Sequence, residues 1–294
     1  MKLALCLRDN PVSETVRLAK LVESLGFDEL WMPDTARGPQ RGRTDGRLTG
    51  RDAFCVLSAV FSATTALHAG IGVAAAPMHP RVTLALLAGT LQEHSGGRFS
   101  LGVGLSHPET AAEHGIPFPE KPIRHMRERV RELKEYSISG MGFGGRWPVL
   151  LAALGPQMLK LAASEADGAV LTWLSPRQAM TVVRSIADVS ATPFRTVLYV
   201  RVMPAQAARR ETDYYLQLAN YRRHFALQGL HTTDEIAAST ILPADDLGAA
   251  RQRIAEYAEA GIETLCLYPK GLTAQAQDQL LQTIAEMQEV RRDA

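Results

Sequence analysis

The sequence has few of the residues that mark several common kinds of protein. Its 294 residues include three cysteines, Cys6, Cys55 and Cys266, with no CxxC pair and no metal-ligand spacing among them. Two of them lie in apolar runs, where a thiol is usually a small core side chain. We therefore expect neither a disulfide framework nor a bound metal, and a reducing compartment, the cytoplasm, is the simplest location.

The chain also lacks an excess of charge and a long apolar segment. Its 32 Lys and Arg residues nearly cancel its 31 Asp and Glu residues, which leaves a net charge of +1. This balance gives no general attraction to nucleic acid or to an anionic membrane. The apolar N-terminus meets Arg8 and Asp9 too soon to form a signal peptide or a membrane span. We expect neither nucleic acid nor a membrane as a partner.

Several catalytic motifs are absent as well. The sequence has no HExxH, no GxSxG, no P-loop and no Cys–His signature, which argues against the enzyme classes that depend on them. The first apolar run is followed by residues 7–11 (LRDNP), which contain no glycine-rich nucleotide turn. An open, doubly wound sheet normally carries such a turn after an early strand, so this alternative fold is disfavoured.

The sequence does contain a regular alternation of apolar strands and amphipathic helices. The strands alternate poorly, as strands of a parallel sheet do when both faces are buried. We expect strands at 2–7, 29–32, 69–74, 98–103, 148–152, 168–171, 194–202 and 264–267. We expect helices from the cap Ser13 to Leu25 and at 52–67, 81–94, 123–136, 157–166, 176–187, 211–227, 246–260 and 274–291. Eight such units predict a single α/β domain over residues 1–294, a closed (β/α)8 TIM barrel.

Five stretches in order resemble the luciferase-like monooxygenase family, which implies a bacterial-luciferase-like barrel. They span nearly the whole chain, so that their agreement in register is more specific than any one of them. The stretches are Gly26–Asp34 (GFDELWMPD), Thr65–Val73 with His79-Pro80, Thr90–Gly104 (TLQEHSGGRFSLGVG), Ala152–Leu159 with Ala166–Gly168, and Ala258–Glu263.

One further stretch, Leu171–Pro176 (LTWLSP), resembles the branch of this family that uses coenzyme F420, in which an NWL-x-P run follows the sixth strand. The resemblance implies an F420H2-dependent reductase that transfers hydride from the deazaflavin to a C=C or C=N bond of a small organic substrate. Two alternatives stay open: an FMN-dependent monooxygenase that uses O2, and a degenerate flavin-binding barrel without turnover. The bound cofactor decides between the two enzyme classes, since reduced flavin reacts readily with oxygen and reduced deazaflavin does not.

The candidate catalytic residues follow strands, at the rim where barrel enzymes carry their sites. Asp34 follows the second strand, and by resemblance it contacts the isoalloxazine edge or a reacting group; alternatively it caps its own loop. His107 lies where some relatives have an acidic proton donor, and imidazole suits this role near neutral pH; alternatively it is an exposed loop residue. Thr35, a substrate-side position, stands where many F420-dependent members have histidine.

The candidate cofactor residues come from three strand ends. At Gly72-Val73 the resemblance implies a non-proline cis peptide bond that forms a bulge behind the ring, and it places Gly104, Leu105 and Ser106 near the ring. Free N–H groups at the helix start after the fifth strand suit a phosphate, and Pro156 needs no N–H partner there. The phosphate loop comprises Ala153, Leu154, Gly155, Pro156 and Gln157.

Three further expectations concern the surroundings of this site. Trp173 is expected either to form a flat wall of the substrate pocket or to pack beneath the rim. The stretch between Tyr136 and Pro148 is shorter than the usual insertion of the family, which implies a reduced substrate lid. Relatives commonly form dimers, so we expect a homodimer. The apolar positions compatible with this interface, which also suit the core, are Val56, Leu57, Val60, Phe61, Leu84 and Leu87.

Overall fold

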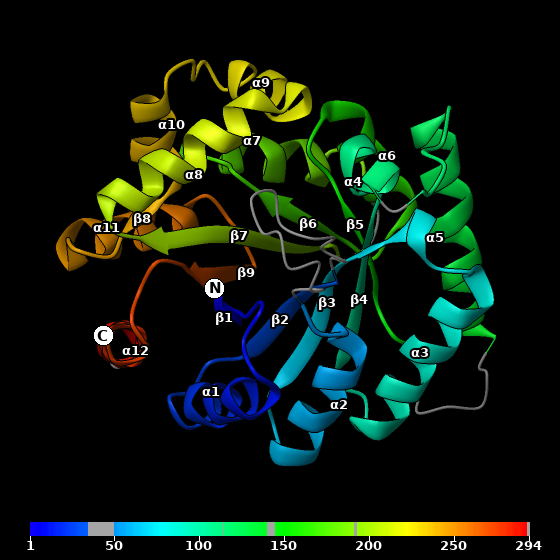
Figure 1. Ribbon diagram of the computed structural model, residues 1–294, viewed down its shortest axis with the longest axis horizontal. Coiled ribbons are helices and arrows are strands. Elements are labelled where there is room, and N and C mark those ends of the chain that lie inside the picture. Colours follow the sequence, from blue (N-terminus) through cyan, green and yellow to red (C-terminus); the bar gives the residue numbers. More distant parts are fainter. Residues whose placement is uncertain (35–49, 114, 140–144, 191–192, 293–294) are drawn as a thin grey trace.

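A closed barrel of parallel strands forms the centre of the protein (Figure 1). The computed structural model describes residues 1–34, 50–113, 115–139, 145–190 and 193–292. Within these residues, the strands from β1 to β7 pair in sequence order, and β9 pairs with both β7 and β1 to close the ring. The predicted (β/α)8 barrel is confirmed. Its strands are β1 (Lys2–Cys6), β2 (Glu29–Asp34), β3 (His68–Ala75), β4 (Phe99–Gly104), β5 (Val149–Ala152), β6 (Gly168–Thr172), β7 (Arg195–Met203) and β9 (Thr264–Pro269).

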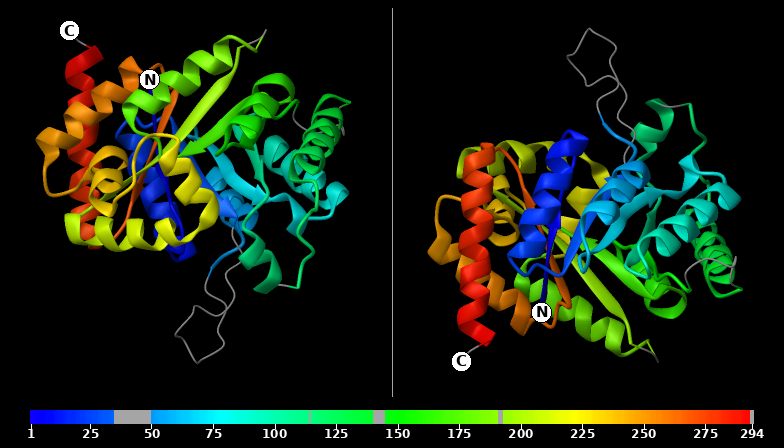
Figure 2. Two further views of the ribbon diagram at one scale, coloured as in Figure 1. Left: turned by 90° about the horizontal axis from the view of Figure 1, so that it is seen from above. Right: turned by 90° about the horizontal axis from the view of Figure 1, so that it is seen from below.

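Helices surround the barrel, and the first and last of them lie side by side (Figure 2). Arg17 of α1 and Asp278 of α12 form an ion pair of 2.9 Å across this contact. Pro11 precedes α1, so the predicted cap Ser13 lies inside its first turn instead. The surrounding helices are α1 (Val12–Ser24), α2 (Ala53–Ala63), α3 (Arg81–His94), α5 (Pro122–Ile138), α6 (Pro156–Glu165), α7 (Pro176–Ala187), α11 (Leu247–Glu259) and α12 (Ala274–Arg292).

The segment between β7 and β9 differs most from the prediction. One helix was expected over residues 211–227, but the chain forms α8 (Ala205–Gln217) and α9 (Ala219–Ala226), with extended backbone at Leu218 between them. Residues 211–227 contain no Gly or Pro, so nothing in the local sequence marks the break. The chain then forms α10 (Thr233–Thr240) and the two-residue strand β8 (Leu242–Pro243), and two more unpredicted short helices lie after β3 and β4: η1 (Ala76–Met78) and α4 (Pro108–Glu113).

The two-residue repeat of the strands determines which side chains point into the barrel. On β1, Leu3 and Leu5 point outward into the main core between barrel and helices, whereas Ala4 and Cys6 point inward. The inward group is centred on Trp31, whose indole lies across β3. A Cβ at Gly70 would lie 2.6 Å from this ring, so glycine is required there. The barrel interior is therefore a packed core below its rim.

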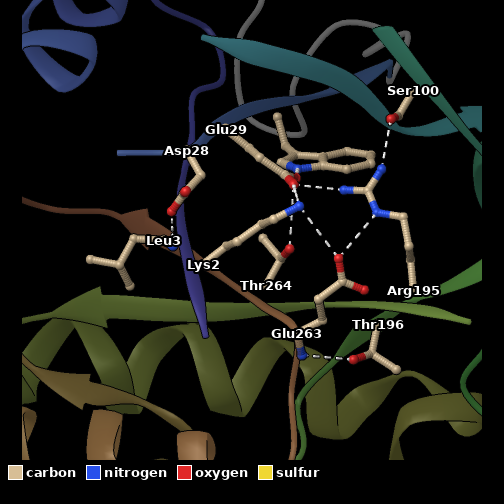
Figure 3. Close-up of polar contacts among 10 residues, drawn as sticks. Lys2, Leu3, Asp28, Glu29, Ser100, Arg195, Thr196, Glu263 and Thr264 are labelled. Atoms are coloured by element: carbon tan, nitrogen blue, oxygen red, sulfur yellow. Dashed lines mark hydrogen bonds and ion pairs between the residues drawn. The ribbon is translucent and has the colours of Figure 1, made fainter. Parts of the chain in front are cut away.

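A buried polar network closes the barrel at the N-terminal ends of the strands (Figure 3). The buried Glu29 carboxylate accepts a hydrogen bond of 2.6 Å from Arg195 Nη2 and one of 2.8 Å from Trp31 Nε1. Arg195 Nη1 also donates to Ser100 Oγ, at 2.9 Å. Lys2 Nζ lies 3.6 Å from Glu29. Because the charge of Glu29 is both paired and hydrogen-bonded, its burial is compensated.

We expect Arg195→Met to destabilise the fold strongly, since among the described residues it leaves the buried Glu29 with only the more distant Lys2 as a cation. Removing one partner of such a pair lowers the free energy of unfolding by roughly 3 kcal/mol. Urea denaturation measures this loss. Arg17→Met is the matched control, because its ion pair lies at the surface and should contribute less than about 1 kcal/mol. Equal losses in the two variants would contradict the assigned role of the network.

Candidate functional site

Asp34 ends β2 at the C-terminal rim of the barrel, where it meets a histidine from the next βα loop. Its Oδ2 lies 2.5 Å from Nε2 of His79, and both side chains are largely covered. The His79 ring packs edge-on against Phe54 of α2, with ring centroids 5.9 Å apart. The sequence analysis named His79 only as part of a stretch that resembles the family, so this pairing was missed. The Asp34 carboxylate is thus held by an imidazole that can exchange a proton with it.

The third strand is irregular at the position that the sequence indicated. The Gly72–Val73 peptide bond is cis, as predicted, and the register of β3 against β4 shifts between Ile71 and Ala74. A Cβ at Gly72 would lie 2.0 Å from the Tyr199 hydroxyl, so any side chain there would force its neighbours to move. These contacts explain why glycine occupies position 72.

Val73 and two glycines of β4 form an apolar floor at the barrel mouth. A Cβ at Gly102 or Gly104 would lie 3.0 or 2.8 Å from a methyl group of Val73, so the valine occupies the space that side chains on β4 would need. A Cβ at Gly104 would also lie 3.0 Å from Cβ of Ala152, at the end of β5. We call Val73, Gly102 and Gly104 the glycine floor. The structure thus brings the predicted residues of β3 and β4 together.

The loop after β4 carries His107 toward helix α9. Ser106 has a φ of 65°, a left-handed conformation that turns the chain just before His107. The Asn220 amide nitrogen lies 3.4 Å from Nδ1 of His107, and the ring packs against Tyr221 at 5.6 Å. If Asn220 donates this bond, the neutral ring carries its proton on Nε2. Burial lowers the pKa of His107, while Glu109 acts in the opposite direction.

The start of α6 presents backbone amides that have no partner among the described residues, and it lies beside the glycine floor. Gly155 precedes the helix without a side-chain cap, and Pro156 is its first residue. The first amides of a helix have no intrahelical partner, so those of Gln157 and Met158 are available to an anion. A Cβ at Gly155 would meet no atom of the described residues within 4 Å, which leaves the approach open on their side.

His224 of α9 fixes this loop to the end of β6, a contact that the sequence did not reveal. Its Nδ1 lies 2.9 Å from the Leu154 carbonyl oxygen and its Nε2 lies 3.0 Å from that of Trp173. Gln228 donates a further bond of 2.8 Å to the Trp173 carbonyl. Burial lowers the pKa of His224, and the bonds to the two carbonyls act against this shift.

The Trp173 ring is buried beneath the helices that cover this side of the rim. It packs 4.9 Å from the Tyr215 ring and 5.5 Å from the Phe225 ring, with the Arg201 guanidinium 3.9 Å above it. Its contacts match the packing role, and a contact with substrate stays a prediction. Thr35 lies outside the described residues, as do residues 140–144 of the short stretch before Pro148.

Other parts of the molecule add little to the site. Among the described residues, no helix is long and apolar enough to cross a membrane. No group of three or more His, Cys, Asp or Glu side chains in the described ranges is placed to hold a metal ion. The positions considered for a dimer interface lie in the core of the protomer, and Leu87 alone of them is only partly buried: Val56, Leu57, Val60, Phe61 and Leu84 are buried. A homodimer stays a prediction.

The fold and the rim together define a class of protein. A parallel (β/α)8 barrel with polar side chains and open backbone amides at its C-terminal rim has the layout of a barrel enzyme. The chain belongs to the luciferase-like monooxygenase family, whose model matches residues 4–264. The family predicted from the sequence motifs is confirmed.

Similar proteins include two 5,10-methylenetetrahydromethanopterin reductases. That of Methanolobus tindarius is 27% identical over 194 residues, 60% of this chain and 56% of the relative. That of Archaeoglobus fulgidus is 32% identical over 176 residues, 54% of this chain and 48% of the relative. The chain thus spans about half the length of these curated relatives. A solved coenzyme F420 dependent tetrahydromethanopterin reductase from Methanopyrus kandleri shares the fold, with a TM-score of 0.73, 16% identity and 97% of each chain covered.

We expect Gly72→Ala to destabilise the protein, because the added methyl group overlaps the Tyr199 hydroxyl. Overpacking of this kind lowers the free energy of unfolding by about 1–3 kcal/mol. Thermal or urea denaturation measures the change. Gly155→Ala is the control, since its added Cβ meets nothing within 4 Å and should leave stability nearly unchanged. If Gly72→Ala is as stable as the wild type, the barrel interior has room for the added methyl group and is not tightly packed.

Proposed function

We propose that the protein is an F420H2-dependent reductase that transfers hydride to a C=C or C=N bond of a small organic substrate. The observation that carries the proposal is the pairing of the glycine floor with the open amides of α6, one beside the other at the rim. The glycine floor carries no side chain apart from Val73, so a flat ring can lie against it. The amides at the start of α6 can donate hydrogen bonds to a phosphate. The name of the solved tetrahydromethanopterin reductase, which is described as coenzyme F420 dependent, and the LTWLSP stretch support F420 over FMN.

The residues present fit such a cofactor. Val73 would lie behind its ring, and Gly104, Leu105 and Ser106 would border the edge of the ring. The phosphate would sit at Gly155, Pro156 and Gln157, next to Ala153 and Leu154, where the helix dipole adds to the hydrogen bonds. When bound, F420H2 supplies the hydride from C5 of the deazaflavin.

Proton transfer would fall to His107 or Asp34. His107 lies in the loop that borders the ring site, and its Nε2 would hold the proton given to the substrate atom next to the reduced carbon. Asp34 shares a hydrogen bond with His79, so it would orient a polar edge of the ring or relay a proton through this imidazole. Both roles need only groups that can carry a proton at the rim.

The cofactor is tested by titrating the purified protein with F420 and with FMN at matched concentrations, following tryptophan fluorescence. We expect F420 to bind more tightly than FMN, since an F420H2-dependent reductase must bind this cofactor. Tighter binding of FMN, together with oxygen uptake in the presence of FMNH2, would replace the proposal by a monooxygenase. Binding of neither cofactor would indicate a degenerate barrel and would also contradict the proposal.

The role of His107 predicts a pH dependence. A proton donor must be protonated, and burial holds the pKa of His107 below its ordinary value of 6.5. The rate of F420H2 oxidation by an enoate or imine should therefore fall as the pH rises through a value below 6.5. His107→Gln should lower kcat by roughly 10²–10⁴-fold and remove this limb of the profile.

The control for this experiment is His94→Gln, which removes an exposed histidine on α3 that bonds to Ser62. We expect it to keep both kcat and the pH profile of the wild type. A His107→Gln variant with an unchanged profile would exclude His107 as the donor and leave Asp34 as the candidate.

A further inference from the structure

The barrel mouth has a cationic side opposite the glycine floor. On β7 and β9, Tyr199 and Cys266 are paired in register and face the barrel interior. Arg201 and Tyr268 are the next paired positions with the same orientation, two residues nearer the rim. Arg8 follows β1 at the same level, two residues beyond the inward Cys6. In the ring of strands, β7 and β9 lie across from β3 and β4, which carry the floor (Figure 1).

Arg201 is buried and held in a fixed orientation. Its guanidinium lies 3.9 Å from the centroid of the Trp173 ring and 4.8 Å from that of Tyr215. Nε lies 3.2 Å from Glu211 Oε1, and Nη1 donates to Thr172 Oγ1 at 3.2 Å. A guanidinium positioned in this way presents its remaining N–H groups in a defined direction.

On this cationic side of the mouth, a single carboxylate pairs with two cations. Glu211 of α8 binds Arg201 and also accepts from Lys270 Nζ with both oxygens. Burial alone would raise the pKa of Glu211, but Arg201 and Lys270 outweigh it and hold this pKa below its ordinary value. Glu211 is therefore ionised at neutral pH and can neutralise only one of its two partners.

Arg8 brings a third cation to the same side. It forms an ion pair of 3.6 Å with Asp9, and its Nε is buried without a hydrogen-bond partner among the residues that the structure describes. Arg8 also faces Tyr268, whose pKa burial raises and this arginine lowers. Three cations thus meet two carboxylates among these described residues. Because a partly buried excess charge is costly, the site is suited to a further anion.

We propose that Arg8, Arg201, Lys270 and the Tyr268 hydroxyl form a subsite for a carboxylate of the substrate. This inference rests on the proposed reductase function and narrows its substrate class. With the ring on the glycine floor, a substrate anchored across the mouth would place its reducible bond between the two sides. A carboxylate conjugated to that bond also withdraws electrons from it, so the class is that of enoates and imino acids. An anionic oxygen of the cofactor has the same chemistry, and the experiment separates the two sources.

The experiment measures the binding of two pairs of matched probes, crotonate with crotonamide and benzoate with benzamide, by calorimetric titration at constant ionic strength. In the wild type we expect each carboxylate to bind at least about tenfold more tightly than its amide, as charge-assisted hydrogen bonds do. Lys270→Gln and Arg8→Gln should each reduce this preference to less than about threefold. Arg8→Lys should retain part of it. Arg201 is left unchanged, because its burial between aromatic rings makes a folding defect the expected result.

The control variant is Arg209→Gln, which changes an exposed cation of the same helix as Glu211, paired with Asp234 on the outer surface. It should keep the full preference for carboxylates. Titration with F420 on the same preparations shows which partner uses the subsite. Unchanged F420 affinity in Lys270→Gln and Arg8→Gln, with loss of the carboxylate preference, is the expected result.

Two outcomes would overturn the inference. If neither carboxylate binds the wild type more tightly than its amide, no such subsite exists. If the two variants lose F420 affinity and keep the preference, the cations serve the cofactor instead. A third result is distinct from these two. If the wild type fails to bind F420, the proposed function is contradicted, but the comparison of carboxylate and amide binding on the same protein can still be interpreted.

Discussion

The Trp31 indole fills the middle of the barrel and connects its two ends. Below, its Nε1 donates to Glu29, which binds Arg195 and so ties the ring to the polar network that closes the barrel. Above, a Cβ at Gly72 would lie 2.9 Å from the indole and closer still to the Tyr199 hydroxyl. The requirement for a glycine at position 72, next to the glycine floor, therefore comes in part from a side chain that fills the barrel interior.

A second organising element is the eight-residue helix α9, which contacts the loops on the β4 to β6 side of the rim. His224 binds the carbonyls of Leu154 and Trp173, and Asn220 approaches His107. One helix thus contacts the loops after β4, β5 and β6. The first two of these loops carry His107 and the proposed phosphate position. Its neighbour α8 supplies Glu211 to the cationic side of the mouth. Inserted helices after β7, rather than the barrel itself, determine the shape of this rim.

The sequence predicts the repeating parts of this molecule well. Helices α3 and α7 begin and end at the predicted residues, and the cis bond at Gly72 lies where the resemblance indicated. Periodicity cannot reveal the rim contacts, because they join residues of separate loops, as in the bond between Asp34 and His79. It also failed at Leu218, where tertiary packing breaks a segment whose local sequence favours one helix.

The contact of Trp31 with two glycines also bears on how this barrel can diverge among relatives. Indole and glycines share one volume, so a smaller residue at position 31 leaves a cavity, while a larger one at 70 or 72 cannot enter. Substitutions at the three positions are therefore not independent, and their effects on stability should be strongly non-additive. Across homologues, covariation of positions 31, 70 and 72 would mark the lineages in which the barrel interior, and the rim above it, has been rebuilt.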